Sequence, residues 1–453
     1  MKRREFLRGT AMGAGALALT SVHGLAANIS PASQDAAASF SAVSKFPDSN
    51  PKWRLTWDAA HAVLAANVKH VPRYDEKVLF EGAVYPGIWQ ECGPHEGLVY
   101  ATLTQSVPYV ADLPSPFAVA RANHMAFFAL QREDGQLPAS IKLSEAGFGQ
   151  IQMVVPIAAT AWELAQITRD SELLETAYTA CSRWDAWLRR YRDTRGTGLV
   201  EGFCTYDTGH DNSPRWKGVS NRCPEADARK FAPNEGVPRL CPDLSATVYG
   251  GRIALAAMAQ ALGKKGGEEA RWLADAEKIR KLILEKLYSP EDAAFYDVDT
   301  SGRFVRVRGD VISRVLGEHV LKRDDKHDRH IFDDIWSRQL HNPKAFWTPY
   351  PFPSIAEDDP AFVRPIPRNS WGGASQALTA LRAPRWMEHY GKGVEMRTMM
   401  HAWVDAISRS GTNGTGEFRQ QMDPMTGEFT MADPSGYSPA ALVYLDFIRR
   451  LGA

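Results

Sequence analysis

The sequence predicts an all-α protein in which pairs of helices follow one another around a toroid. Apolar residues recur at steps of three and four in about ten segments, which is the period of amphipathic helices. Strand-like alternation is confined to one short hairpin, Phe295–Asp299 with Arg303–Val307. Irregular loops rich in Trp and Pro recur between the helical pairs. We expect one domain over residues 53–453, because no change of composition divides this span.

The expected helices follow a regular order along the chain. Asp243 is placed to cap one of them, and Gly263 is placed to end it. Residues 81–97 form a turn-rich, aromatic segment that we expect to be a loop, and loops of this kind often carry sites. The helices are expected at 53–69, 117–131, 152–168, 172–191, 243–262, 272–287, 329–340, 370–390, 395–408 and 438–451.

The first 27 residues have the features of an export signal. Residues 2–8, Lys-Arg-Arg-Glu-Phe-Leu-Arg, resemble the twin-arginine box, and small, weakly apolar residues follow as far as Ala27. Residues 28–52 are rich in Ala, Ser and Pro, which is typical of a flexible leader. We expect residues 1–27 to be removed and the mature protein to be periplasmic or secreted.

Charge and cysteine content exclude several classes of partner. Lys plus Arg and Asp plus Glu both number 53, and no basic stripe indicates nucleic acid binding. After the signal, no apolar run is long enough to span a bilayer. Five cysteines leave at least one unpaired, and a Cys223–Cys241 disulfide is plausible. No spacing suggests zinc or calcium, so neither a metal nor a cofactor is expected. The oligomeric state is not indicated.

The most distinctive stretch is Asp207-Thr-Gly-His-Asp-Asn-Ser-Pro-Arg-Trp216. Acid, amide, guanidinium and indole groups on a loop suit the recognition of a polyhydroxylated ligand, with a carboxyl group that can protonate a leaving oxygen. The alternative is a capped turn, in which Asp211 or Asn212 starts a helix and Arg215 pairs with a carboxylate.

This stretch resembles the ESGxDNSPR signature of clan G glycoside hydrolases, which include family 63 α-glycosidases, mannosylglycerate-hydrolase-like enzymes and trehalases. The resemblance implies an (α/α)6 barrel and places the general acid at Asp211, with its pKa expected to be raised by burial. Asp207 and Thr208 replace the usual Glu and Ser. Residues 131–138, 150–162 and 178–202 resemble further family segments in the same order, so the resemblance covers roughly residues 80–450.

A second segment with this resemblance is residues 368–375, Arg-Asn-Ser-Trp-Gly-Gly-Ala-Ser. It stands where the family has RxxWRGPxWPxxN. Trp371 fits, but the second arginine, the proline and the second tryptophan are missing, which implies a rebuilt sugar subsite. The alternative for Trp371 is a core aromatic residue at a helix start.

The family's catalytic base is the uncertain element. An inverting glycosidase needs a second carboxylate ~6.5–9.5 Å from the acid. In the family it is a Glu in an ExYxPxTG-like segment, and here Gln420 occupies that position. An amide cannot accept a proton from water. Glu417 is the nearest substitute, although it also fits a solvated surface charge; Asp423, Glu428 and Glu91 are weaker candidates.

The remaining substrate contacts are expected from aromatic, amide, imidazole and charged side chains. The complete set of predicted substrate-binding residues is Trp89, Glu91, His95, Glu96, Asn123, Gln150, Asp207, His210, Asn212, Arg215, Trp216, Trp371 and Gln420.

The sequence therefore favours an exported glycoside hydrolase that acts on an oligosaccharide or glycoside, exo-acting and inverting, with Asp211 as acid and Glu417 as base. A polysaccharide lyase on the same toroid is a second hypothesis, with His210, Tyr206 and Arg215 available to neutralise a uronate and abstract a proton. A sugar-binding protein that has lost the base is the third.

Overall fold

The computed structural model describes residues 51–106, 112–233, 236–367, 370–411, 414–430 and 435–452. The expected signal, residues 1–27, and most of the expected leader lie outside the described residues. The first described helix begins at Pro51, two residues before the expected start of the domain.

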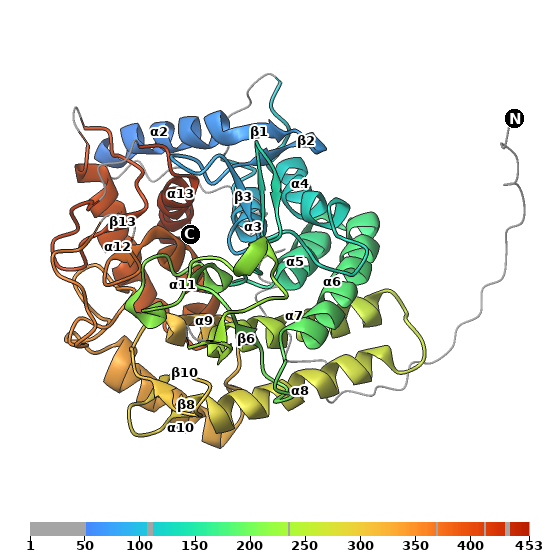
Figure 1. Ribbon diagram of the computed structural model, residues 1–453. Helices are drawn as coiled ribbons and strands as arrows, with labels where there is room; N and C mark the ends of the chain where they lie inside the picture. The colour runs from blue at the N-terminus through green and yellow to red at the C-terminus, as the bar shows by residue number, and fades with distance from the viewer. Residues whose placement is uncertain are drawn as a thin grey trace, which may run out of the picture.

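Twelve α-helices of the described chain form two concentric rings (Figure 1). The outer ring consists of α2 (Pro51–Asn67), α4 (Pro116–Ala129), α6 (Ser171–Tyr191), α8 (Glu268–Lys286), α10 (Lys326–Ile335) and α12 (Gly393–Arg409). The inner ring consists of α3 (Gly93–Thr102), α5 (Ile157–Thr168), α7 (Pro242–Ala261), α9 (Val311–Gly317), α11 (Ala377–His389) and α13 (Ser438–Gly452). Each inner helix contacts the next, and α13 contacts α3, so the ring is closed. The predicted (α/α)6 barrel is confirmed.

Short strands lie in the loops between the helices, so the chain is not strictly all-α. They are β1 (Val68–Val71), β2 (Tyr74–Leu79), β3 (Gly87–Trp89), β4 (Ser140–Lys142), β5 (Ala146–Gly147), β6 (Glu201–Gly202), β7 (Arg239–Leu240), β8 (Tyr288–Ser289), β9 (Ala294–Phe295), β10 (Asp297–Val298), β11 (Phe304–Val305), β12 (Ser375–Gln376) and β13 (Gln421–Met422). The predicted hairpin is present, with Val298 of β10 opposite Phe304 of β11. It belongs to the four-stranded sheet β11-β10-β7-β6.

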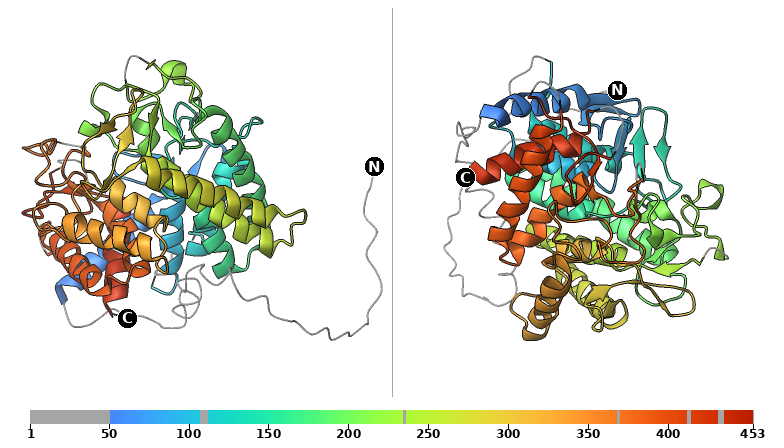
Figure 2. Two further views of the ribbon diagram at one scale, coloured as in Figure 1. Left: turned by 90° about the horizontal axis from the view of Figure 1, so that it is seen from below. Right: turned by 90° about the vertical axis from the view of Figure 1, so that its left-hand side faces the viewer.

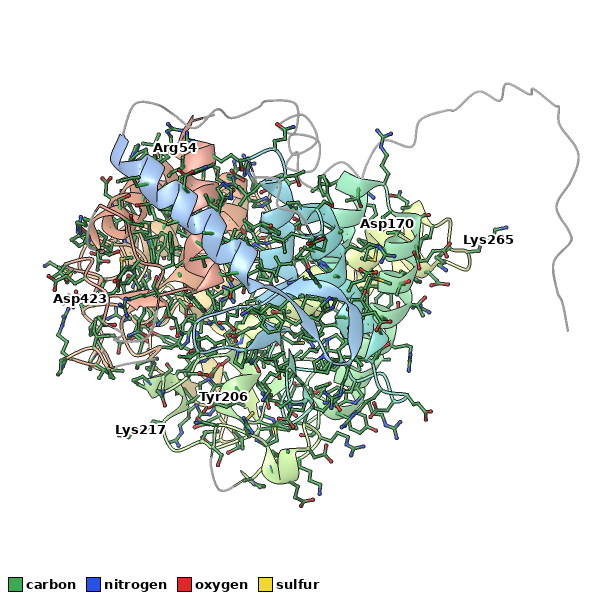
Figure 3. All side chains as sticks on the ribbon, turned by 90° about the horizontal axis from the view of Figure 1, so that it is seen from above. Arg54, Asp170, Tyr206, Lys217, Lys265 and Asp423 are labelled. Carbon is green, nitrogen blue, oxygen red and sulfur yellow. The ribbon has the colours of Figure 1, made fainter. Side chains whose placement is uncertain are left out.

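The long loops gather at one end of the barrel, here called the loop face (Figure 2). The inner helices start at this face, so their N-termini surround the barrel axis there. In Figure 3, Tyr206 and Lys217 mark the loop face, whereas Asp170 and Lys265, which follow α5 and α7, lie toward the other end. Within the described residues, no helix has both the length and the apolar character needed to cross a bilayer.

Burial explains which helices the sequence predicts well. Outer helix α6 has one apolar side, with Leu173, Ala177 and Trp184 buried, and its N-cap Asp170 accepts from the Leu173 N–H at 2.9 Å. Inner helices α3 and α9 were not predicted. Nearly all residues of α3 and all residues of α9 are buried, so neither shows the polar side on which helical periodicity depends.

Candidate active site

The loop that carries Asp211 lies across the N-termini of the inner helices. A 3-10 turn, η1 (Thr205–Thr208), leads into Gly209, whose φ of 64° favours glycine. A second 3-10 turn, η2 (Pro214–Trp216), follows. The backbone carbonyl of Asp211 accepts from the Trp371 N–H at 2.9 Å. Asp211 itself is half-buried, and Asn212 is exposed. The two segments with the strongest family resemblance therefore meet in space.

Arg215 holds this loop from beneath. Its guanidinium donates to Asp297 at 2.8 and 2.6 Å and to Asp243 at 2.7 and 2.8 Å. All three side chains are buried. Because its donors are committed to these carboxylates, Arg215 supports the loop and is not a sugar ligand. This corrects the predicted substrate contact and agrees with the alternative interpretation that Arg215 pairs with a carboxylate.

Asp207 is a second support. It is fully buried and ion-paired with the equally buried Arg192. It also accepts from the backbone N–H of Ile151 at 2.9 Å and of Phe203 at 2.7 Å. Asp207 thus fixes the loop to its neighbours and does not reach substrate. Trp216 is buried as well, and its indole N–H donates to Thr208 Oγ1 at 2.9 Å. Both predicted substrate contacts are corrected to structural roles.

His210 links the loop to α9 and α11. Arg215 donates to its Nδ1 at 3.0 Å, so Nε2 carries the proton and donates to Asp310 at 2.7 Å. Burial and the Arg314 charge lower the pKa of His210 to about 4. Although burial opposes it, the Arg314 charge holds the pKa of Asp310 below its usual value. The imidazole is therefore neutral at pH 7 and positions Asp211 rather than contacting sugar, which is a further correction.

Trp89 and Trp371 form an aromatic patch beside the loop. Trp371 is buried and packs with Cys92 and Leu378, and the partly exposed Trp89 packs against this cluster. The Trp371 ring also lies 5.0 Å from that of His210, centroid to centroid. Trp89 therefore retains a surface on which a sugar ring could stack, while Trp371 mainly fixes the loop.

Three glutamates before and within α3 lie near the acid loop. A Cβ at Gly209 would lie 1.5 Å from Glu91 Oε2, so the Glu91 carboxyl contacts the loop backbone directly. Burial raises the pKa of Glu91, and it raises the pKa of Glu96 to about 7. Burial, followed by the charges of Glu96 and Glu91, raises the pKa of Glu81 well above its usual value. Such a concentration of perturbed carboxyl groups is common at catalytic sites.

Some predicted ligands lie below the surface of the site. Asn123 in α4 donates to the carbonyls of Leu79 and Gly93 and accepts from the Leu79 N–H, so it is a structural residue, not a sugar ligand. His95 and Glu96 are buried within α3, which also corrects their assignment as direct contacts. Gln150, nearly buried, donates to Gln152 Oε1 at 3.0 Å.

The family's base position lies beside a tyrosine. Gln420 is buried, and its Oε1 accepts from the Tyr85 hydroxyl at 2.7 Å. Residues 417–420 alternate between half-buried and buried, so Glu417 points away from the side that Gln420 occupies. Glu417 pairs with Arg419 at 2.6 Å, and its N–H donates to Ser410 at the end of outer helix α12. Glu417 is therefore a surface charge, and its assignment as the base is wrong.

The sequence did not single out several residues that shape this site. Tyr85 and Glu81 lie in the predicted loop 81–97, where the turn-rich, aromatic pattern does not distinguish one residue from another. Asp310 precedes the fully buried helix α9, and Arg314 lies within it, where no periodic pattern marked a helix. Asp310 and Arg314 pair with each other four residues apart. Such a spacing is also common for charge pairs on exposed helices, so it does not mark a buried site in the sequence.

An (α/α)6 barrel that presents acidic and aromatic loops at the N-termini of its inner helices is an architecture suited to carbohydrate chemistry, and the protein is a glycoside hydrolase. The family model for the mannosylglycerate hydrolase MGH1-like glycoside hydrolase domain matches residues 116–438. The chain belongs to this family, and its membership confirms the resemblance inferred from the loops.

Solved structures share the fold at low sequence identity. The mannosylglycerate hydrolase of family 63 from Thermus thermophilus, in complex with glucose, superposes with a TM-score of 0.63 at 20% identity, over 86% of this chain and 99% of that chain. Neutral trehalase from Saccharomyces cerevisiae gives 0.61 at 14% identity, over 87% and 81%. A rhamnosidase from Klebsiella oxytoca gives 0.53 at 12%, over 90% and 65%. No curated protein matches the sequence.

Proposed function

We propose that the protein is an exported, exo-acting glycoside hydrolase that cleaves a small glycoside or oligosaccharide with inversion, and that Asp211 is the general acid. The observation that carries this proposal is the setting of Asp211. It is half-buried on a loop whose neighbours Arg215, Asp207 and His210 are held by buried charged partners. A carboxyl group fixed in this way can be aimed at a leaving oxygen.

For the base, we propose Glu81. The charge of Asp211 is one of the causes of the raised pKa of Glu81, and the charges of Glu81 and Asp211 both raise the pKa of Tyr85 after the larger effect of burial. Tyr85 is the residue whose hydroxyl binds Gln420. Glu81 Oε1 accepts from the Tyr437 hydroxyl at 2.7 Å, which fixes the carboxylate. In this arrangement Gln420 and Tyr85 position the water, and Glu81 takes its proton when the carboxyl is ionised. Because the pKa of Glu81 is raised, turnover should increase with pH as Glu81 loses its own proton.

The aromatic surface of the loop face and the family membership suggest the substrate class. Trp89 offers an aromatic surface for one sugar ring. Glu91 is buried against Gly209, so it supports the loop from below and does not contact sugar. The family name and the Thermus structure make mannosylglycerate the first compound to test, followed by α-linked disaccharides.

One observation favours a second candidate function, a sugar-binding protein without turnover. Gln420 replaces the family's carboxylate and is already engaged with Tyr85. In that case Asp211 would contribute to binding only, and no variant that lacks a new carboxylate would hydrolyse substrate.

The decisive experiment is proton NMR of the full protein with this substrate panel. Wild type should release a sugar whose first-formed anomer is inverted. Asp211→Asn and Glu81→Gln should each lower kcat by at least about 100-fold, the usual scale for acid–base groups. Glu428→Gln, which alters an exposed carboxylate of similar size, is the matched control and should retain the wild-type rate.

Gln420→Glu separates the two functions. If Glu81 is the base, Gln420→Glu should leave kcat nearly unchanged or lower it. If the protein is a binder that has lost its base, wild type binds without turnover, and Gln420→Glu gains hydrolysis. Ligand binding by wild type with no hydrolysis by any variant would refute the proposed reaction.

Export is tested separately in cells. Replacing both arginines of the twin-arginine pair, Arg3→Lys with Arg4→Lys, should leave the protein in the cytoplasm, because the export receptor reads this pair. Fractionation followed by immunoblotting measures the outcome. Unchanged export of the double variant would rule out this route.

A further inference from the structure

We propose that Cys204 and Cys223 are an oxidisable pair whose disulfide closes the loop that carries Asp211. The two residues flank this loop: Cys204 directly precedes η1, and Cys223 directly precedes the short turn η3 (Pro224–Ala226). A bond between them would enclose residues 205–222 in one covalent ring. The inference concerns thiol chemistry and does not depend on the proposed glycosidase reaction.

The geometry brings the two thiols together. Their sulfur atoms lie 3.7 Å apart, and both side chains are buried, in a small cluster with Phe203. The backbone aligns the segments around them, because Thr205 N donates to Ser220 O at 3.0 Å and Tyr206 N donates to Asn221 O at 3.1 Å. Sulfur atoms in contact need only a small side-chain adjustment to bond.

The other cysteines are placed elsewhere. Cys92 precedes α3, Cys181 lies within α6, and Cys241 precedes α7. All five cysteines are free and buried. Cys223 is in contact with Cys204, so the Cys223–Cys241 pairing expected from the sequence is wrong. Spacing along the chain could not identify the partner, because the 205–222 segment folds back on itself.

A metal site is the competing explanation for this cluster, since Asp207 lies within ligating range of both sulfurs. Arg192 argues against it. Its guanidinium is ion-paired with Asp207, and one N–H also points to Cys223 Sγ at 3.7 Å. The Arg192 guanidinium thus already supplies the positive charge that a metal cation would supply to Asp207 and Cys223.

The same arginine suits thiol–disulfide exchange. An N–H directed at Cys223 Sγ can hydrogen-bond to a sulfur that carries negative charge during the reaction. Cys223 follows a segment in which Ser220, Asn221 and Arg222 are exposed, so local opening of this segment admits an oxidant. Cys204 is deeper, and burial raises its pKa well above the usual value.

The reaction balances with a disulfide as oxidant, for example oxidised glutathione. Cys223 loses its proton and attacks one glutathione sulfur, which forms a mixed disulfide and releases the first glutathione. Cys204 then loses its proton and attacks Cys223 Sγ, which releases the second glutathione. Two protein thiols are oxidised, one glutathione disulfide is reduced, and the two protons end on the two glutathione thiols.

The test is a thiol count on the full protein before and after incubation with oxidised glutathione. Denaturation and alkylation with iodoacetamide should label five cysteines in the reduced protein and three after oxidation, and peptide mapping should find Cys204 joined to Cys223. Cys204→Ser and Cys223→Ser should each prevent the intramolecular link. Cys181→Ser, a buried cysteine in an outer helix, is the matched control and should still form it.

A second treatment controls for burial, which could keep the oxidant away from the thiols of the folded protein. The denatured protein is refolded in a glutathione redox buffer, so that every thiol is accessible at the start. Circular dichroism verifies that the serine variants fold. Hydrogen exchange of residues 205–222 should slow in the oxidised protein. Five labelled thiols after both treatments, or a link that joins Cys223 to Cys241, would overturn the proposal.

Discussion

The buried cluster of Arg215 with Asp243 and Asp297 makes a quantitative prediction. Arg215→Met removes the guanidinium while keeping much of its volume, and it leaves two carboxylates buried without their main partner. Losing one partner of a buried ion pair costs about 3–5 kcal/mol. Asp243 retains Arg314 at 3.6 Å, which compensates for part of the loss. We therefore expect the free energy of unfolding to fall by about 4 kcal/mol.

Calorimetry or thermal circular dichroism measures this effect. For a domain of roughly 400 residues the unfolding entropy near Tm is about 0.8 kcal/mol/K, so about 4 kcal/mol corresponds to a Tm lower by about 5 °C. Arg229→Met is the matched control. Arg229 pairs with Asp227 at the surface, where one ion pair contributes less than about 1 kcal/mol. The Tm of the Arg229→Met variant should therefore differ from that of the wild type by no more than about 1 °C.

The cause is tested by removing the orphaned charges. In the Arg215→Met background, Asp243→Asn with Asp297→Asn should recover part of the lost stability, because the amides cost less to bury than unpaired carboxylates. The reasoning is refuted if Arg215→Met lowers Tm no more than Arg229→Met does, or if the two amides lower Tm further.

Three further predictions concern other positions. Burial raises the pKa of Glu318 to about 8, so the folded state keeps a proton that the unfolded state loses above about pH 4.5. The free energy of unfolding should therefore fall by about 3 kcal/mol between about pH 4.5 and 7. Urea denaturation across this pH range should show a smaller fall for Glu318→Gln than for the wild type. Gly209→Ala should lower stability by more than about 1 kcal/mol and impair turnover, because its Cβ would clash with Glu91, and serine at the open, exposed Gly218 serves for comparison. Trp89→Ala should raise KM more than it lowers kcat if the ring only stacks on sugar, and an equal loss in kcat and kcat/KM would contradict that role.

The barrel could be predicted because most of its helices have one apolar and one polar side. Outer helices such as α6 and α12 show this pattern in the sequence. Inner helix α7 is largely buried, but it is long enough for its apolar repeat to be recognised, whereas α3 and α9 are short and buried almost all round. The two-residue strands were missed for another reason: pairs such as β12 with β13 have no alternation to detect. The longer strand β2 was missed because its exposed and buried residues do not alternate.

The sequence indicated which loops form the site, but it did not indicate the role of each residue in them. The family resemblance singled out the loops of Asp211 and Trp371, and these two loops are in contact in the structure. It could not separate residues that face substrate from residues that hold the loop, because Arg215 and Asp207 find their partners in distant segments. Glu417 was misassigned because chain proximity to Gln420 says nothing about which side of the segment each residue faces.

The closure of the inner ring has a consequence for biosynthesis. The last helix, α13, packs between the first ones, against α2 and α3. During translation α2 therefore lacks its main partner, and α3 lacks one of its partners, until residues 438–452 leave the ribosome, so part of the apolar surface of these helices stays uncovered for most of synthesis. A nascent chain arrested before Ser438 should depend on chaperones and be degraded by proteases that spare the complete protein. The order of assembly, and not only the final packing, thus places the quality-control checkpoint at the C-terminal helix.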